Sequence, residues 1–227
     1  MFITRKLATY CCLLTSIVFY FGCGSNSSEG TGSKIAIADT TAKSPEKLFT
    51  TCTACHGHNG EGIQAMNAPA LAGQEEDYLI RQLKNLKNGI RGTHEKDTYG
   101  KQMVTIAANL KDGEIEPIAR YIKALSPVKI TKTITGNLEA GKTKYNAVCA
   151  SCHGPDATGN KTLFAPKLVG VGDWYLKRQI QNFINGIRGA HPQDVQGIQM
   201  AAMAKTIGDE QAITDVVAYI QTLDKSK

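Results

Sequence analysis

The sequence predicts an all-α protein built from two tandem domains, and three observations support this prediction. First, residues 52–110 superimpose on residues 149–207 without a gap, at a constant offset of 97. Second, apolar residues recur at helical spacing in both copies, and strand-like alternation is confined to residues 128–136. Third, the repeated unit is roughly 90 residues long, enough to enclose its own core and too long for a solenoid repeat.

The helices of each copy have recognisable start and stop signals. Ser44 and Pro45 suit the N-cap and the first position of a helix. A helical stripe over 78–86 stops at Gly89, and a last helix, capped by Asp112, ends before a proline. We therefore expect one domain over 44–127, an extended linker over 128–136 and a second domain over 137–227.

The N-terminus has the features of an export signal. Two cations, Arg5 and Lys6, precede an uncharged apolar run from residue 7 to 22, which predicts a signal peptide over 1–22; an uncleaved anchor helix is the alternative. In "YFGC" a small residue precedes Cys23, which resembles the bacterial lipobox and predicts lipidation of Cys23. The Gly/Ser-rich stretch that follows predicts a flexible lipoprotein tether over 23–43. We expect a periplasmic protein tethered to a membrane.

The net charge does not indicate a nucleic-acid partner. The formal charge is +6, and two of these cations belong to the predicted signal peptide. The remaining charges form no basic run and no patch interleaved with aromatic residues. We therefore expect no nucleic-acid binding.

The motif that carries chemistry is C-x-x-C-H, which occurs twice in register. Its first copy is Cys52, Cys55 and His56; the second is Cys149, Cys152 and His153. Two thiols at this spacing can add to the two vinyl groups of one haem, and the adjoining imidazole then becomes the proximal iron ligand. A zinc site would need its second ligand pair much closer, and a thioredoxin-like dithiol would need a preceding strand. The sequence predicts two covalent haem c groups.

The sixth ligand of each iron should come from the later half of each domain. Met103 and Met200 are register-matched, and each follows a glycine-containing stretch that we expect to be a loop. His94 and His191 are also matched and compete for this position. Two further methionines, Met66 and Met203, face non-methionine residues in the other copy, and we expect them to fill the core.

Two matched arginines, Arg91 and Arg188, lie in the repeated "GIRG". A guanidinium suits bidentate recognition of a carboxylate, so each can bind a haem propionate, or each can be a solvated loop residue.

Taken together, these motifs resemble the dihaem class I cytochromes c of the cytochrome c4 type over residues 44–227. The resemblance rests on C-x-x-C-H, "APALAG"/"APKLVG", the "YL" helix, the late methionine and the final "YI" helix. It implies two cytochrome c folds related by a pseudo-twofold axis. It also implies that Pro69 and Pro166 accept the N–H of the proximal imidazoles.

Ligation by His and Met would leave no open iron position, so the expected function is electron transfer. The resemblance implies a donor of the quinol–cytochrome c reductase type and an oxidase or reductase as acceptor. The alternatives are a dihaem enzyme, such as a peroxidase or a thiosulfate-oxidising cytochrome, and a fixed subunit of a respiratory complex.

Overall fold

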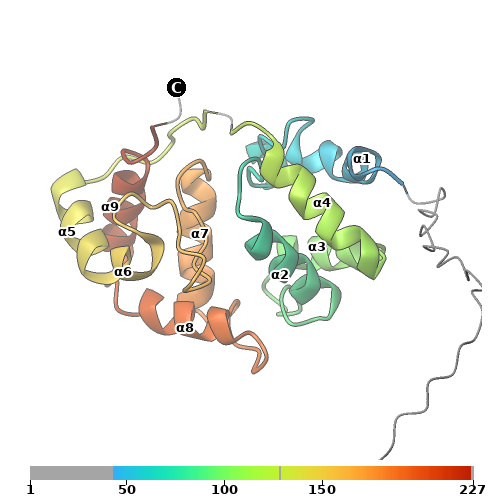
Figure 1. Ribbon diagram of the computed structural model, residues 1–227. Helices are drawn as coiled ribbons and strands as arrows, with labels where there is room; N and C mark the ends of the chain where they lie inside the picture. The colour runs from blue at the N-terminus through green and yellow to red at the C-terminus, as the bar shows by residue number, and fades with distance from the viewer. Residues whose placement is uncertain (1–42, 128, 226–227) are drawn as a thin grey trace, which may run out of the picture. The chain divides into compact units, whose positions relative to one another are not determined.

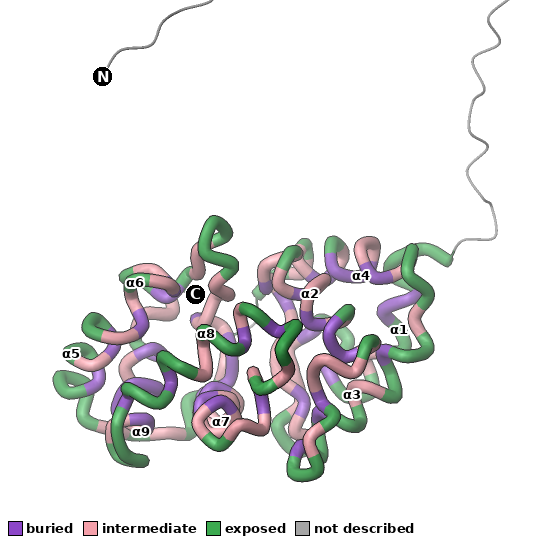
Figure 2. The backbone as a smooth tube through the Cα atoms, turned by 90° about the horizontal axis from the view of Figure 1, so that it is seen from below, coloured by how far each residue is buried: buried purple, intermediate pink, exposed green. Residues whose placement is uncertain are grey.

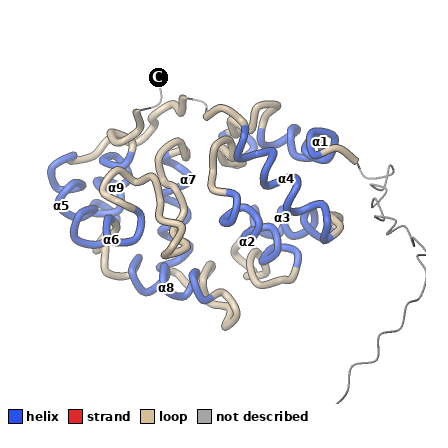
Figure 3. The backbone as a smooth tube through the Cα atoms, in the orientation of Figure 1, coloured by secondary structure: helices blue, strands red, loops and turns tan. Residues whose placement is uncertain are grey.

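The computed structural model describes residues 43–127 and 129–225. Over these residues the regular elements are helices, joined by loops, and strand pairing is limited to two isolated bridges (Figure 3). The all-α prediction is confirmed. The predicted signal peptide, Cys23 and all but the last residue of the predicted tether lie outside the described residues.

The helices fall into two groups that follow the repeat (Figure 1). The first group, here called domain 1, comprises α1 (Pro45–His56), η1 (Gln64–Met66), α2 (Glu76–Lys87), α3 (Thr98–Ala108) and α4 (Asp112–Ala124). The second group, domain 2, comprises α5 (Leu138–Val148), α6 (Ala150–His153), α7 (Asp173–Ile184), α8 (Val195–Ala204) and α9 (Glu210–Ile220).

Side-chain caps fix several helix starts. The Ser44 hydroxyl accepts a hydrogen bond from the Lys47 N–H at 3.2 Å, with Pro45 at the first helical position, as predicted. Asp209 caps α9 by accepting from the Ala212 N–H at 2.9 Å. The prediction for Asp112 was wrong by one position, because Lys111 is the N-cap of α4 and Asp112 is its first residue.

Each domain has its own apolar core. In domain 1, α4 packs against α1 and α2; in domain 2, α9 packs against α5 and α7. Buried and exposed residues alternate along these helices (Figure 2). The core of domain 1 is Leu48, Phe49, Leu79, Ile118, Ala119 and Ile122. The core of domain 2 is larger and includes Tyr145, Leu176, Ile180, Phe183, Val216, Val217 and Ile220.

Helices α5 and α9 cross at a glycine. A Cβ added at Gly141 would lie 2.1 Å from the backbone oxygen of Asp215, so only glycine permits this approach. The crossing fixes the first helix of domain 2, which leads directly into the second C-x-x-C-H motif.

Residues 129–136, between the domains, contain no helix, and the second half of this stretch is held by domain 2. The carboxylate of Asp173, which is fully buried, accepts hydrogen bonds from the backbone N–H groups of Thr133 and Ile134 and from the Thr133 hydroxyl. Asp215 accepts from the Asn137 N–H at 2.8 Å. None of the helices in the described part of the chain combines the length and hydropathy of a membrane span.

Candidate haem sites

The two motif histidines end their helices and are buried in the same way. His56 is the last residue of α1, and His153 is the last residue of α6. The Nδ1 of His56 lies 2.8 Å from the carbonyl oxygen of Pro69, and the Nδ1 of His153 lies 2.8 Å from that of Pro166. A carbonyl oxygen can only accept, so Nδ1 carries the proton in both rings. The predicted histidine–proline contacts are confirmed.

This geometry leaves the second nitrogen of each ring free. Burial lowers the pKa of both imidazoles, and the bond to the proline carbonyl opposes this effect only in part. A neutral imidazole that is protonated at Nδ1 presents its Nε2 lone pair, which is the form that binds a metal.

The four motif cysteines are free thiols. Within each motif the two cysteines are three residues apart, which places them on one face of a helical turn. Burial raises the pKa of Cys52 to about 11 and that of Cys149 to about 12. A redox-active dithiol needs a lowered thiol pKa, so these environments do not favour thioredoxin-like chemistry.

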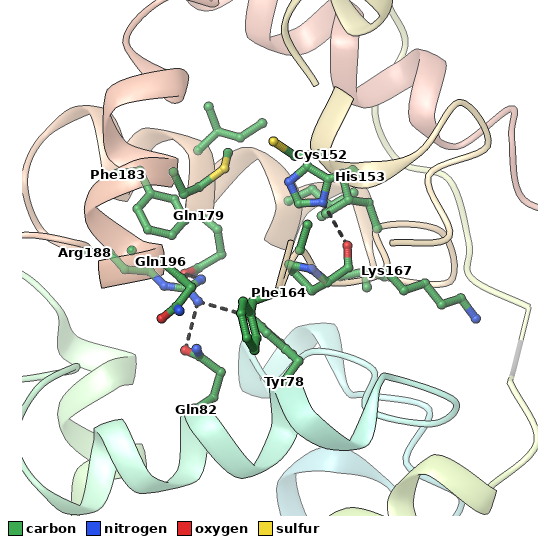
Figure 4. A pocket seen from close by; sticks show the side chains of 18 of the residues that line it. Tyr78, Gln82, Cys152, His153, Phe164, Lys167, Gln179, Phe183, Arg188 and Gln196 are labelled. Carbon is green, nitrogen blue, oxygen red and sulfur yellow. Dashed lines mark hydrogen bonds between the residues drawn. The ribbon is translucent and has the colours of Figure 1, made fainter. Parts of the chain in front are cut away.

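A cavity in domain 2 brings the expected haem ligands together. It has a volume of about 1380 Å³, mouth included, and is lined by Cys149, Cys152, His153 and Met200. In Figure 4 His153 and Cys152 lie side by side at this cavity. Its remaining wall is largely apolar and includes Leu176, Ile180 and Phe183 of domain 2, while domain 1 contributes residues such as Leu79 and Gln82. A largely apolar wall with a few polar groups is typical of a cofactor site, and this lining suits a porphyrin.

The two matched methionines lie in helices, whereas we expected loops. Met103 lies within α3 and Met200 within α8. Each helix starts at an aspartate, Asp97 or Asp194, whose carboxylate accepts a hydrogen bond from the N–H of the glycine three residues later. The glycine that we interpreted as part of a loop therefore belongs to the first turn of the helix, and the aspartate before it was the missed signal.

Met200 and the competing His191 have different surroundings. Met200 packs against the core of domain 2 and lines the cavity with His153, whereas His191 is not among the cavity-lining residues. The Nδ1 atoms of His94 and His191 accept hydrogen bonds from the N–H of Lys96, at 3.1 Å, and of Gln193, at 3.2 Å. These bonds tie both imidazoles to their own loops.

The core positions expected for the other two methionines were wrong. Met66 is 51% exposed and Met203 is 38% exposed. Met203 lines the cavity together with Met200, three residues before it on α8. The methionine pattern alone could not separate a core position from one at a cavity wall.

Both "GIRG" arginines bridge the two domains. Arg91 donates to Gln82 Oε1 of its own domain at 2.7 Å, and to the Tyr175 hydroxyl of domain 2 at 3.1 Å. Arg188 is buried and donates to Gln179 Oε1 at 2.8 Å and to the Tyr78 hydroxyl of domain 1 at 3.1 Å. These arginines are therefore not solvated loop residues. The tyrosines and glutamines were missed, although they stand in the repeated "YLIRQ" and "YLKRQ".

The contact between the domains is reciprocal. Arg81 donates to the backbone oxygen of Phe164 at 2.8 Å, and Arg178 donates to that of Asn67 at 2.9 Å. Each residue of the second pair lies 97 positions from its equivalent in the first pair. Such reciprocity is what a twofold relation between two similar domains produces.

Several atoms at this contact also fit a bound anion. The Nε atoms of Arg81, Arg91 and Arg188 are buried without a hydrogen-bond partner among the described residues. Buried donors normally have partners, so these atoms point to a missing acceptor. The carboxylates of haem are acceptors of this kind.

Comparison with known proteins agrees with this fold. Residues 42–126 and residues 138–224 each match the family model described as cytochrome c. The chain therefore belongs to the cytochrome c family and contains two of its domains in tandem. More narrowly, it is a dihaem electron-transfer cytochrome of the c4 type with two covalent haem c groups.

Three similar proteins illustrate this relationship. Cytochrome c4 of Azotobacter vinelandii is 29% identical, and the match covers 83% of this chain and 92% of the relative. A thiosulfate dehydrogenase electron acceptor of Thiomonas intermedia is 29% identical, with 81% and 83% covered. The crystal structure of reduced cytochrome c4 from Pseudomonas stutzeri superimposes with a TM-score of 0.61 at 25% identity, and covers 78% of this chain and 95% of that one.

Proposed function

We propose that the chain is a periplasmic electron carrier in which both irons have one histidine and one methionine ligand. In domain 1 the thiols of Cys52 and Cys55 attach the haem, and His56 and Met103 bind its iron. In domain 2 the corresponding residues are Cys149, Cys152, His153 and Met200. When bound, haem iron supplies a one-electron couple between its ferric and ferrous forms.

The residues of each site have separate tasks. The bond from the imidazole Nδ1–H to the proline carbonyl, 2.8 Å in both domains, orients the ring and makes its Nε2 a better donor. The methionine sulfur occupies the remaining iron position and stabilises ferrous iron. A site filled on both sides leaves no position for a substrate, which suits a carrier.

The observation that carries this proposal is the shared wall of the domain 2 cavity. His153 and Met200 both line it, with the two thiols of the same motif. Domain 1 supplies the same residues in register. An optical redox titration of the purified protein tests the proposal and should show two haems, each taking up one electron reversibly. Intact mass should show both haems still attached after acid–acetone extraction, and a gain of one haem would contradict the proposal.

For its partners, we propose a donor of the quinol–cytochrome c reductase type and a terminal oxidase or periplasmic reductase as acceptor. A lipid on Cys23 would hold the carrier near these membrane complexes. The relative named as a thiosulfate dehydrogenase electron acceptor supports carrier function and adds a dehydrogenase as a candidate donor. Stopped-flow reduction by each purified donor ranks these partners directly.

The alternative to a carrier is a dihaem enzyme, which would keep one iron open or use an unusual ligand. All four cysteines of the described residues belong to the two C-x-x-C-H motifs, and both domains carry the matched methionine. These observations favour the carrier, and carbon monoxide binding separates the two functions.

A further inference from the structure

A closed ring of hydrogen bonds crosses the contact between the two domains. Gln82 Oε1 accepts from Arg91 Nη1 at 2.7 Å and from Arg188 Nη2 at 2.9 Å. Gln179 Oε1 accepts from Arg188 Nη1 at 2.8 Å and from Arg91 Nη2 at 3.4 Å. Each arginine therefore binds one glutamine from each domain, and we call these four residues the Arg–Gln ring. Figure 4 shows the bond from Arg188 to Gln82 across the contact.

The ring holds two positive charges together and has no carboxylate bonded to it. Its acceptors are neutral amide oxygens, and no carboxylate of the described residues lies within ion-pair distance of Arg91 or Arg188. Burial by itself would lower the pKa of Arg91, but Tyr175, Tyr78 and, from a distance, Asp97 outweigh burial and raise it. Burial by itself would raise the pKa of Tyr78, but the guanidiniums of Arg188, Arg91 and Arg81 outweigh burial and lower it. Buried cations are unfavourable unless an anion compensates them.

Both ring arginines have a donor ready for such an anion. Their Nε atoms are buried and unpartnered. Arg188 also lines the cavity that contains His153 and Met200, and Arg91 is its register-matched equivalent in domain 1. The anions that belong at these sites are haem propionates, so the inference rests on the proposed function.

We propose that the Arg–Gln ring is one shared binding site for propionates of both haems, so that each arginine influences the reduction potentials of both irons. The ring makes this possible because neither arginine belongs to one domain alone: each is held by Gln82 and by Gln179. Charges in a site of low dielectric also act over a longer distance than charges in water.

The sign of the effect follows from charge. A nearby cation favours the ferrous state, which carries less positive charge, so it raises the potential. Arg91→Gln and Arg188→Gln should therefore each lower both midpoint potentials. The measurement is an equilibrium redox titration of the holoprotein, which needs no partner protein. A shift confined to one haem would overturn the shared site and leave only two separate arginine–propionate contacts.

A second pair of variants keeps the ring intact while changing its charge. Gln82→Glu and Gln179→Glu retain an accepting oxygen of similar geometry and add a negative charge between the two guanidiniums. Each should lower both potentials, even if the arginine variants fail to assemble. Unchanged potentials in both glutamate variants would also overturn the proposal.

Arg178→Gln is the matched control. Arg178 crosses the same contact and donates to Asn67 at its side-chain and backbone oxygens, at 2.8 and 2.9 Å, but it is not part of the ring. This variant should weaken the contact between the domains and leave both reduction potentials unchanged. If Arg178→Gln lowers both potentials as much as the ring variants do, the fall in those variants comes from a loosened domain contact and not from the charge of the ring. Titration of the unmutated protein distinguishes failure of this inference from failure of the proposed function. If it shows fewer than two reversible haem couples, the proposed function itself is wrong.

Discussion

The Arg188 side chain of domain 2 donates a hydrogen bond to the hydroxyl of Tyr78 in domain 1, at 3.1 Å. Its register-matched counterpart, from Arg91 to the hydroxyl of Tyr175, has the same length in the opposite direction. The two domains therefore hold each other through equivalent residues. Removing one member of each pair measures how much this contact contributes to stability.

We expect Tyr78→Phe and Tyr175→Phe each to lower the free energy of unfolding by about 1 kcal/mol, because each removes one acceptor from a buried guanidinium. The cost stays modest because both guanidinium nitrogens also donate to glutamines of the ring. Chemical denaturation followed by circular dichroism measures the change. Tyr121→Phe is the control, since its hydroxyl has no partner among the described residues, and an equal loss there would contradict the account.

Asp173→Ala should destabilise domain 2 by about 3 kcal/mol. The substitution removes the buried carboxylate that accepts from the N–H groups of Thr133 and Ile134 and from the Thr133 hydroxyl, and a hydrogen bond to a charged group contributes about 1.5–3 kcal/mol. Among the described residues, its counterpart Glu76 forms an ion pair only with the exposed Arg120, at 3.5 Å. Glu76→Ala should therefore change stability by less than about 1 kcal/mol. Equal effects of the two alanines would show that the linker is not held as described.

Gly141→Ala should destabilise the crossing of α5 and α9, because the added methyl group would overlap the backbone of Asp215. Overpacking of this kind costs about 1–3 kcal/mol. Gly113→Ala, in α4, meets no atom within 4 Å and should be neutral or stabilising by up to about 1 kcal/mol. Thermal unfolding of both variants tests the pair. A neutral Gly141→Ala would mean that the helices are not in close contact.

Cys23→Ser should release haem-bearing protein from membranes into the soluble periplasmic fraction. A fully acylated lipoprotein cysteine is anchored firmly, whereas a single acyl chain would give only marginal binding. Cell fractionation with haem staining measures the distribution. Continued membrane retention of Cys23→Ser would favour the uncleaved anchor helix or docking in a complex.

The sequence was most informative where chemistry depends on spacing. C-x-x-C-H with its repeat predicted two haem groups, and the family resemblance predicted the bond from each proximal histidine to Pro69 or Pro166. The periodicity of the apolar residues predicted the all-α fold. These features are local or are fixed by the constant offset between the copies.

Features that depend on packing were harder to predict. Met103 and Met200 were expected in loops, because the capping role of Asp97 and Asp194 was not recognised. Met203 was expected in the core, but the α8 helix places it at the cavity wall. Gln82 and Gln179 gain their role only when the two domains meet, which a pattern within one domain does not reveal.

The central claim is that a methionine is the sixth ligand of each iron, and carbon monoxide binding tests this claim most directly. The unmutated ferrous protein should bind carbon monoxide poorly near neutral pH, whereas Met103→Ala and Met200→Ala should each create one binding site. His94→Ala and His191→Ala, the matched controls, should leave the spectra of both haems largely intact. Rapid stoichiometric binding by the unmutated protein would contradict the claim, because it would show an open iron of the kind that an enzyme keeps.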